Sequence, residues 1–395
     1  MRRAPIFFWL ILLMISGAAD SVGRLQASDW TTSRGDAAST GFAPGTLPKE
    51  PELLWEFSRE KSGYEGTPVI AAGKVFAGDV EGNVYCLELA TGNEVWKTKF
   101  NNGFVASPAY RNGRVVLGDF DGRVVCLNAD DGKLLWEADI RQAMAAGANF
   151  VEDMVLITSE GGELFAYRLE TGELVWEYST GDQLRSAPTI WKHYALLGGC
   201  DGRLHKIDLK LGKAEGDGLL LEGPSGSTPA IYGNVAIVPT QSGQVLAFDM
   251  LKGEKLWSFS DTERAQEIRS SPAIVPFSGT ASRLEAGGDV SNSEEGDTIA
   301  VVTTRNRRVL GLGTRDGKMV WEAVVRKRCD ASPVICDGRV WVGGLDGNMY
   351  AFDAQTGEER WTHQLTGQLI ASPSISEGKL LVATDKGTIA CFGAK

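Results

Sequence analysis

A repeat of about forty residues runs through most of this chain and limits its fold more than any other feature. Each unit begins with a small residue followed by proline, and an alternating apolar strand comes later in the unit. The apolar strands follow one another at 40, 40, 40, 41, 64, 40 and 40 residues, which gives eight units. One unit has Ala148 in place of the proline. The prolines are Pro68, Pro108, Pro188, Pro229, Pro272, Pro333 and Pro373.

Each unit has the pattern of four short strands. In residues 106–140, three runs rich in valine and leucine follow the opening strand, and Asn112-Gly113, Asp121-Gly122 and Asp131-Gly132 separate the runs. These dipeptides favour the φ > 0 geometry of tight hairpins. Four strands per forty residues is typical of a propeller blade. The sequence therefore predicts an all-β, eight-bladed β-propeller with four-stranded blades.

The spacing also predicts how the ring closes. The last unit ends at residues 391–395, before its fourth strand, and a strand of that kind stands instead at residues 53–57. We expect this N-terminal strand to complete the last blade, which leaves no open sheet edge. The expected organisation is an extended segment over 20–52 and one propeller over 53–395. The 64-residue spacing in the sixth unit indicates a polar loop insertion at 278–297.

The N-terminus has the pattern of an export signal. Met1-Arg2-Arg3 is followed by a ten-residue apolar run and then by small residues at 16–19. Because spanning a membrane takes about 20 apolar residues, a cleaved signal peptide over 1–19 is favoured over a retained anchor. We expect export to the periplasm or cell envelope, with no transmembrane segment in the mature chain. The first cysteine is Cys86, so no lipid-anchor cysteine is expected.

Charge and cysteine usage narrow the classes of function. With 51 acidic and 40 basic residues, the net charge of −11 does not favour binding of nucleic acid or of an anionic membrane. Cys329 and Cys336 lie on one expected strand, roughly 20 Å apart and too far for a disulfide. The remaining cysteines show no pairing pattern, and the three histidines show no ligand spacing. We expect neither a disulfide framework nor a metal site.

Tryptophan recurs at one register of the repeat. It stands four residues after a turn glycine and ten residues after a small residue in six units. A large flat ring packs well against a small side chain and a bare glycine peptide, so we expect these positions to join neighbouring blades. The fourth unit has Lys206 and Gly216 instead, which predicts the least tightly docked blade. The expected docking residues are Trp55, Trp96, Trp136, Trp176, Trp257, Trp321 and Trp361.

This pattern resembles the tryptophan-docking repeat of the pyrroloquinoline-quinone (PQQ) repeat superfamily. The segment Asp29-Trp30, Arg34-Gly35-Asp36 and Ser39-Thr40-Gly41 is similar to the N-terminal part of bacterial PQQ-like propellers. The superfamily contains quinone dehydrogenases, envelope assembly scaffolds and sensor domains, so the resemblance implies the fold and leaves several functions open.

The dehydrogenases of the superfamily typically have a vicinal cysteine pair over the quinone, a calcium site, an aspartate base and long insertions. In this chain the closest cysteines are seven residues apart, and one unit alone carries an insertion. We therefore predict a protein that is not an enzyme and binds no cofactor. The alternative is a PQQ-dependent quinoprotein with calcium, or a propeller that binds another small molecule.

The chain also resembles the BamB-like scaffolds of outer-membrane protein assembly. In that family a Leu-Arg loop before a Ser-Ala-Pro strand start contacts the barrel-forming partner, and residues 184–188 read Leu-Arg-Ser-Ala-Pro. The loop here is shorter between Arg and Ser, and residues 222–226 replace the acidic residues of the family. The resemblance implies a monomeric, non-enzymatic scaffold that binds a protein partner in the cell envelope.

The loops that lead into the first strand of each unit are expected to surround one mouth of the central channel. Three residues before the proline register, four of the eight units carry a charge, and Arg326-Lys327-Arg328 lies nearby. These charges predict a docking face for a peptide or protein, and the alternative is ordinary solvated loop charge. The candidate partner-binding residues are Leu184, Arg185, Arg269, Asp330 and Glu65.

Overall fold

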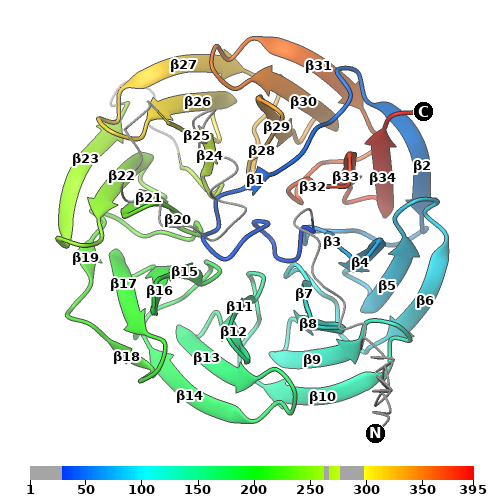
Figure 1. Ribbon diagram of the computed structural model, residues 1–395, viewed down its shortest axis with the longest axis horizontal. Helices are drawn as coiled ribbons and strands as arrows, with labels where there is room; N and C mark the ends of the chain where they lie inside the picture. The colour runs from blue at the N-terminus through cyan, green and yellow to red at the C-terminus, as the bar shows by residue number, and fades with distance from the viewer. Residues whose placement is uncertain (1–28, 262–266, 276–297) are drawn as a thin grey trace, which may run out of the picture.

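The computed structural model describes residues 29–261, 267–275 and 298–395. The signal peptide expected at 1–19 and the insertion expected at 278–297 lie outside these residues. The described residues form strands and no helix, in eight sheets arranged as a closed ring (Figure 1). The predicted all-β, eight-bladed propeller is therefore confirmed.

Each blade is numbered here by its repeat unit, and its strands run from the channel outward. Blades one to four contain β3 (Val69–Ala71), β4 (Lys74–Gly78), β5 (Asn83–Glu88) and β6 (Glu94–Lys99); β7 (Ala109–Arg111), β8 (Arg114–Gly118), β9 (Arg123–Asn128) and β10 (Leu134–Asp139); β11 (Asn149–Val151), β12 (Met154–Thr158), β13 (Glu163–Arg168) and β14 (Leu174–Ser179); and β15 (Thr189–Trp191), β16 (Tyr194–Gly198), β17 (Arg203–Asp208), β18 (Lys213–Ala214) and β19 (Leu219–Leu220).

The other four blades follow the same order. They contain β20 (Ala230–Tyr232), β21 (Val235–Pro239), β22 (Gln244–Asp249) and β23 (Glu254–Ser260); β24 (Ala273–Val275), β25 (Ile299–Thr303), β26 (Arg308–Gly313) and β27 (Met319–Val324); β28 (Val334–Cys336), β29 (Arg339–Gly343), β30 (Asn348–Asp353) and β31 (Glu359–Gln364), with β1 (Phe42–Ala43) added inside β28; and β32 (Ser374–Ser376), β33 (Lys379–Ala383), β34 (Thr388–Gly393) and β2 (Glu52–Ser58).

Blade two shows why these residues form this unit. Asn112 and Gly113 both have positive φ (50° and 73°), so the turn between β7 and β8 is one that asparagine and glycine adopt readily. In β8 and β9 consecutive residues are buried, because the two faces of the blade pack against two neighbouring blades. Val116 pairs with Cys126, and Cys126 pairs with Trp136 in the outermost strand. The small cysteine thus leaves room for the tryptophan beside it.

The two ends of the propeller meet in blade eight, as predicted. β2 pairs antiparallel with β34, from Glu52 opposite Gly393 to Ser58 opposite Thr388. Trp55 lies opposite Cys391, the same pair of residue types as in blades one and two. The N-terminal strand therefore supplies the outermost strand of the last blade, and the ring has no gap between blades eight and one (Figure 1).

Residues 29–43, which the sequence indicated only as an extended segment, cross the centre of the ring (Figure 1). In six blades the second residue of the innermost strand donates its backbone N–H to a carbonyl of this segment. The donors are Ile70, Tyr110, Ile190, Ile231, Ile274 and Ile335, and the acceptors are, in the same order, Trp30, Thr31, Ala37, Ala38, Thr40 and Gly41. One short segment thus contacts nearly every blade at the channel.

Blade three departs from the repeat where it meets this segment. Its residue before the proline register is Gly147, and a Cβ there would lie 3.0 Å from the side chain of Ser33. Its Asn149 side chain donates to the carbonyl of Ala37 at 3.0 Å and to that of Pro188 at 2.8 Å. Gly147 therefore leaves room for Ser33 of the crossing segment, and Asn149 is hydrogen-bonded to that segment.

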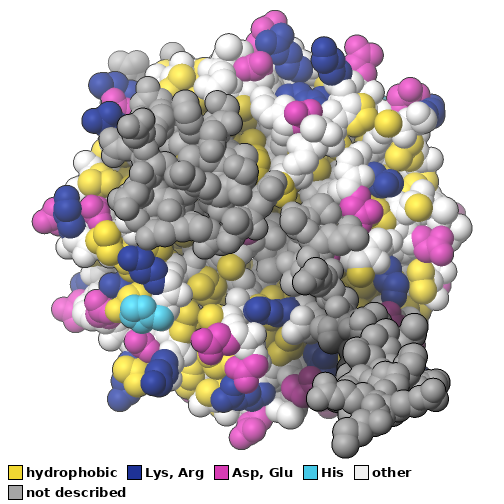
Figure 2. All heavy atoms as spheres, viewed as in Figure 1, with side chains coloured by type: hydrophobic (Ala, Val, Ile, Leu, Met, Phe, Trp, Pro, Cys, Tyr) yellow, Lys and Arg dark blue, Asp and Glu magenta, His cyan; other side chains and the backbone are white. Residues whose placement is uncertain are grey.

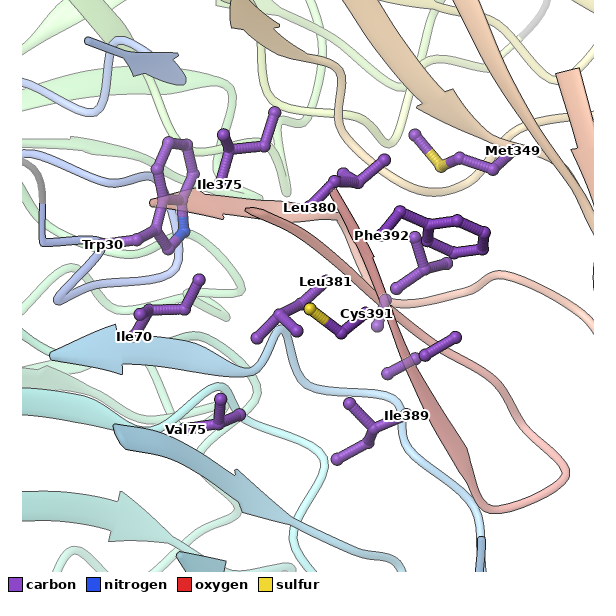
Figure 3. Close-up of a cluster of buried hydrophobic side chains, with 14 of the residues drawn as sticks. Trp30, Ile70, Val75, Met349, Ile375, Leu380, Leu381, Ile389, Cys391 and Phe392 are labelled. Atoms are coloured by element: carbon purple, nitrogen blue, oxygen red, sulfur yellow. The ribbon is translucent and has the colours of Figure 1, made fainter. Parts of the chain in front are cut away.

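The hydrophobic core is divided among the blade interfaces. The largest cluster joins blades one, seven and eight, and Figure 3 shows its side chains between the inner strands. Trp30 lies there beside Ile70 of blade one and Ile375 of blade eight (Figure 3). The crossing segment is therefore packed into the core by its tryptophan as well as bonded to the blades.

Candidate functional site

The loops that lead into the innermost strands share one end of the ring with the turns between the second and third strands. In blade one, Val80 donates its N–H to the carbonyl of Gly63, which joins a turn of that kind to the loop before β3. Phe104 donates to the carbonyl of Asp79, which joins the next loop to the same turn. This end, called the mouth below, is therefore built from loops that are hydrogen-bonded to one another.

Arg185 presents an exposed guanidinium at the mouth. Its Nε lies 3.3 Å from Oε1 of Glu160, and 44% of the side chain is exposed. Leu184, beside it, is buried in the cluster between blades three and four. The Leu184 side chain thus anchors the loop in the core between blades three and four and is not accessible to a partner. A partner would therefore contact Arg185 and its exposed neighbours.

Arg269 and Asp330 are linked through two residues that the sequence analysis missed, Glu267 and Arg305. Arg305 places Nη1 2.7 Å from Oε2 of Glu267 and Nε 3.2 Å from Oδ1 of Asp330. Arg269 lies 2.7 Å from the other oxygen of Glu267. Burial opposes ionisation of Glu267, but hydrogen bonds from the two arginines outweigh it and lower its pKa.

This cluster of blades six and seven also includes Arg328, 3.5 Å from Asp330, so three arginines share two carboxylates and the cluster carries one net positive charge. Within the described residues, no ion pair joins Arg185 or Glu65 to it. Glu65 is exposed on the loop of blade one. The predicted mouth residues therefore form one paired cluster and two separate charges. Arg305 could have been suspected only from its position after β25, since nothing in the repeat marks it.

The predicted docking tryptophans lie at the blade interfaces. In six of them the indole Nε1 donates to a carbonyl of the following blade at 2.8–3.0 Å. The ring lies on the turn glycine of that following blade, rather than on the glycine of its own unit. The pairs are Trp55 on Gly92, Trp96 on Gly132, Trp136 on Gly172, Trp176 on Gly212, Trp257 on Gly317 and Trp321 on Gly357. Trp361 instead packs edge-on against Phe392.

A belt of hydroxyl groups also links the blades beside the channel. The residue before the proline donates its N–H to the Ser or Thr hydroxyl at the same position of the next blade, at 2.9–3.0 Å. The donor and acceptor pairs are Thr67 and Ser107, Ala187 and Thr228, Thr228 and Ser271, Ser271 and Ser332, and Ser332 and Ser372. The small residue of the repeat is therefore usually a hydroxyl residue for a structural reason.

The centre of the ring holds the chain's own Arg34. This buried side chain donates from Nη2 to the carbonyls of Pro272 at 3.0 Å and Pro333 at 2.9 Å. Burial lowers its pKa to about 10, and the nearby Asp36 opposes this shift. The residues that sequence analysis related only to the N-terminal part of similar propellers thus occupy the axis.

Among residues 29–261, 267–275 and 298–395, no three His, Cys, Asp or Glu side chains converge as metal ligands. The same ranges include no helix long and apolar enough to span a membrane. All six cysteines are free thiols. The face drawn in Figure 2 has acidic and basic side chains interspersed around its circumference.

A closed ring of eight four-stranded blades, with indole rings docked between them, defines a propeller of the PQQ-like type. Residues 48–214, 120–294 and 278–391 match the sequence model of the family described as outer membrane protein assembly factor BamB. The chain belongs to this family.

Individual relatives are distant. The assembly factor BamB of Burkholderia pseudomallei is 28% identical over 138 residues, which cover 35% of this chain and 29% of that protein. The chain spans less than half the length of the BamB relatives it matches.

Solved structures share the fold. The crystal structure of BamB from Moraxella catarrhalis has a TM-score of 0.70 at 18% identity and covers 87% of this chain and 98% of its own. A europium-containing methanol dehydrogenase has a TM-score of 0.74 at 14% identity, and the match covers 93% of this chain and 98% of the dehydrogenase chain. A BamB protein and a methanol dehydrogenase therefore share this fold.

Proposed function

We propose that the protein is an exported, non-enzymatic scaffold that binds a protein partner during outer-membrane protein assembly. The observation that carries the proposal is the exposed Arg185 on a mouth loop that the buried Leu184 holds in place. Exposed loop residues on a rigid ring are common places for binding. Family membership and the basic, then apolar, N-terminus support the same role.

Arg185→Glu is expected to reduce binding of the periplasmic domains of the barrel-forming component at least tenfold and to leave the melting temperature unchanged. The reversed charge faces the partner, whereas little packing depends on an exposed side chain. Surface plasmon resonance with the purified partner domains measures the effect.

Arg168→Glu is the matched control, because Arg168 is 43% exposed and forms a similar ion pair, with Asp153. It lies at the end of β13 farther from the mouth and should bind normally. Equal affinity of the wild type and the Arg185 variant would disprove the assignment of Arg185.

A quinoprotein is the second candidate, because the methanol dehydrogenase shares this ring. Titration of the mature chain with PQQ and calcium is expected to show no saturable binding tighter than about 1 μM by calorimetry. The physical reason is that residues 29–43 and the Arg34 side chain occupy the axis. Saturable heat with specific quenching of tryptophan fluorescence would replace the scaffold proposal with a cofactor-binding one.

A further inference from the structure

The interface between blades four and five is built differently from the six that a tryptophan fills. The register position of the tryptophan in blade four is Gly216, and Lys206 stands where a small residue usually pairs with the ring. The outermost strand is also split into β18 and β19, each two residues long. The chain therefore supplies no ring of its own from this position.

Blade five nevertheless presents the receiving surface. Gly253 has a φ of +69°, within the range of the six glycines that a tryptophan ring covers. Its N–H donates to the backbone carbonyl of Asp249, four residues earlier, as in the equivalent turns. A Cβ on those six glycines would lie 2.5–2.7 Å from an indole, whereas a Cβ on Gly253 would meet nothing within 4 Å. The turn thus has the conformation of a docking turn, but no tryptophan ring covers its glycine.

The acceptor for an indole N–H is also in place. The six acceptor carbonyls belong to residues three positions before the docking glycine, and Met250 holds this position before Gly253. No side chain of the described residues donates to the Met250 carbonyl at this site. Trp191, which also lies between blades four and five, does not donate to the Met250 carbonyl, because its Nε1 donates to the carbonyl of Gly233 at 3.2 Å.

A cavity of about 240 Å³ occupies this position, called the vacant slot below. The slot is open to solvent on one side, and its volume exceeds the ~150 Å³ of a cavity that holds a benzene molecule, so the space is large enough for an indole ring. Leu251 lines the slot and is 60% exposed. Lys206, Glu215, Met250, Lys252 and Gly253 also line it.

We propose that the vacant slot binds a tryptophan side chain carried on an extended segment of a partner polypeptide. Its ring would lie on Gly253 and its Nε1 would donate to the carbonyl of Met250. The occupant is argued from the six interfaces of this chain that use the same glycine and carbonyl positions to hold a tryptophan. The lysines at its rim are paired within the chain, Lys206 with Glu215 at 2.9 Å and Lys252 with Asp249 at 3.7 Å, so the slot itself offers the ring and its N–H a largely neutral site.

The slot is independent of the mouth. Gly253 lies in the turn between the third and fourth strands, and in an antiparallel blade this turn is at the opposite end from the loops before the first strand. A protein held at Arg185 and a tryptophan-bearing segment could therefore bind together. The proposal does not rest on the function proposed above.

The test uses a fluorescein-labelled peptide of residues 173–179, Glu-Leu-Val-Trp-Glu-Tyr-Ser, as the probe. In the fold its tryptophan covers Gly212, the counterpart of Gly253 in blade four. Anisotropy should show saturable binding to the full mature chain with a Kd on the order of 0.1–1 mM. The same peptide with alanine in place of Trp176 should bind at least tenfold more weakly.

Two variants locate the binding. Gly253→Ala places a methyl group where the ring must lie and should lose at least tenfold in affinity while the chain stays folded, since the methyl group meets no other atom. Leu251→Glu should also weaken binding, whereas Leu211→Glu, at an equally exposed leucine (61%), should not.

Equal binding of the two peptides, or unchanged affinity of the Gly253 variant, would overturn the proposal. So would the absence of an anisotropy change with the chain at about 1 mM. Self-association of the chain that Gly253→Ala abolishes would overturn the commitment to a separate partner and assign the slot to a second copy.

Discussion

Replacing Trp30 by alanine is expected to lower the free energy of unfolding by about 3–5 kcal/mol, the usual cost of emptying a buried tryptophan site. Trp30 is 1% exposed and packs between the inner strands of blades one and eight (Figure 3). Its backbone exchanges two hydrogen bonds with Ile70, at 2.8 and 2.9 Å. Urea unfolding followed by circular dichroism measures the loss.

Trp30→Phe is the matched control. The indole Nε1 of Trp30 has no hydrogen-bond partner among the described residues, so phenylalanine removes volume without breaking a polar contact. We expect it to be clearly less destabilising than alanine. If alanine and phenylalanine cost the same, or if neither changes the unfolding midpoint, the packing of residues 29–43 across the channel is wrong.

Gly132→Ala is expected to destabilise the propeller by about 2–5 kcal/mol, because two costs add. Gly132 has a φ of +69°, which costs an alanine about 1–2 kcal/mol. Its Cβ would also lie 2.6 Å from the ring of Trp96, and overpacking of this kind costs about 1–3 kcal/mol. Thermal and urea unfolding of the variant measure the sum.

Gly253→Ala separates the two costs. Gly253 has the same φ and the same place in its turn, but no ring lies above it. It should therefore show the conformational cost alone and be more stable than Gly132→Ala by about 1–3 kcal/mol. Equal losses at the two glycines would mean that the Trp96 ring does not rest on Gly132.

The architecture could be predicted from the sequence because its signals are local and repeated. Turn dipeptides such as Asn112-Gly113 recur at a fixed period, and each fixes a hairpin without reference to the rest of the chain. The closure of the ring could be predicted by counting strands, because the strand that is missing after Cys391 is found at residues 53–57. Eight copies of one pattern make a single misread unit harmless.

The crossing segment could not be predicted because it occurs once and its partners are remote in sequence. Arg34 reaches the carbonyls of Pro272 and Pro333, which are 238 and 299 residues away. No periodicity connects such residues, and a buried arginine in a polar stretch reads as an ordinary surface charge.

The candidate site was predicted in part for similar reasons. The register identified the mouth loops, and the exposed Arg185 lies on one of them. The orientation of individual side chains is set by packing between blades, which buries Leu184, pairs Arg269 with Glu267 and pairs Asp330 with Arg305. A one-dimensional pattern does not contain that information.

The pairing of β2 with β34 has a consequence for the order in which the molecule can fold. Ser58 and Thr388, which face each other in blade eight, are 330 residues apart. The N-terminal strand and the segment before it leave the ribosome early, yet their partners are distributed over the blades that follow. Contacts over such separations form slowly. The last steps of folding should therefore be the insertion of residues 29–43 and the pairing of β2, and until then the chain has an open sheet edge that a chaperone would have to protect.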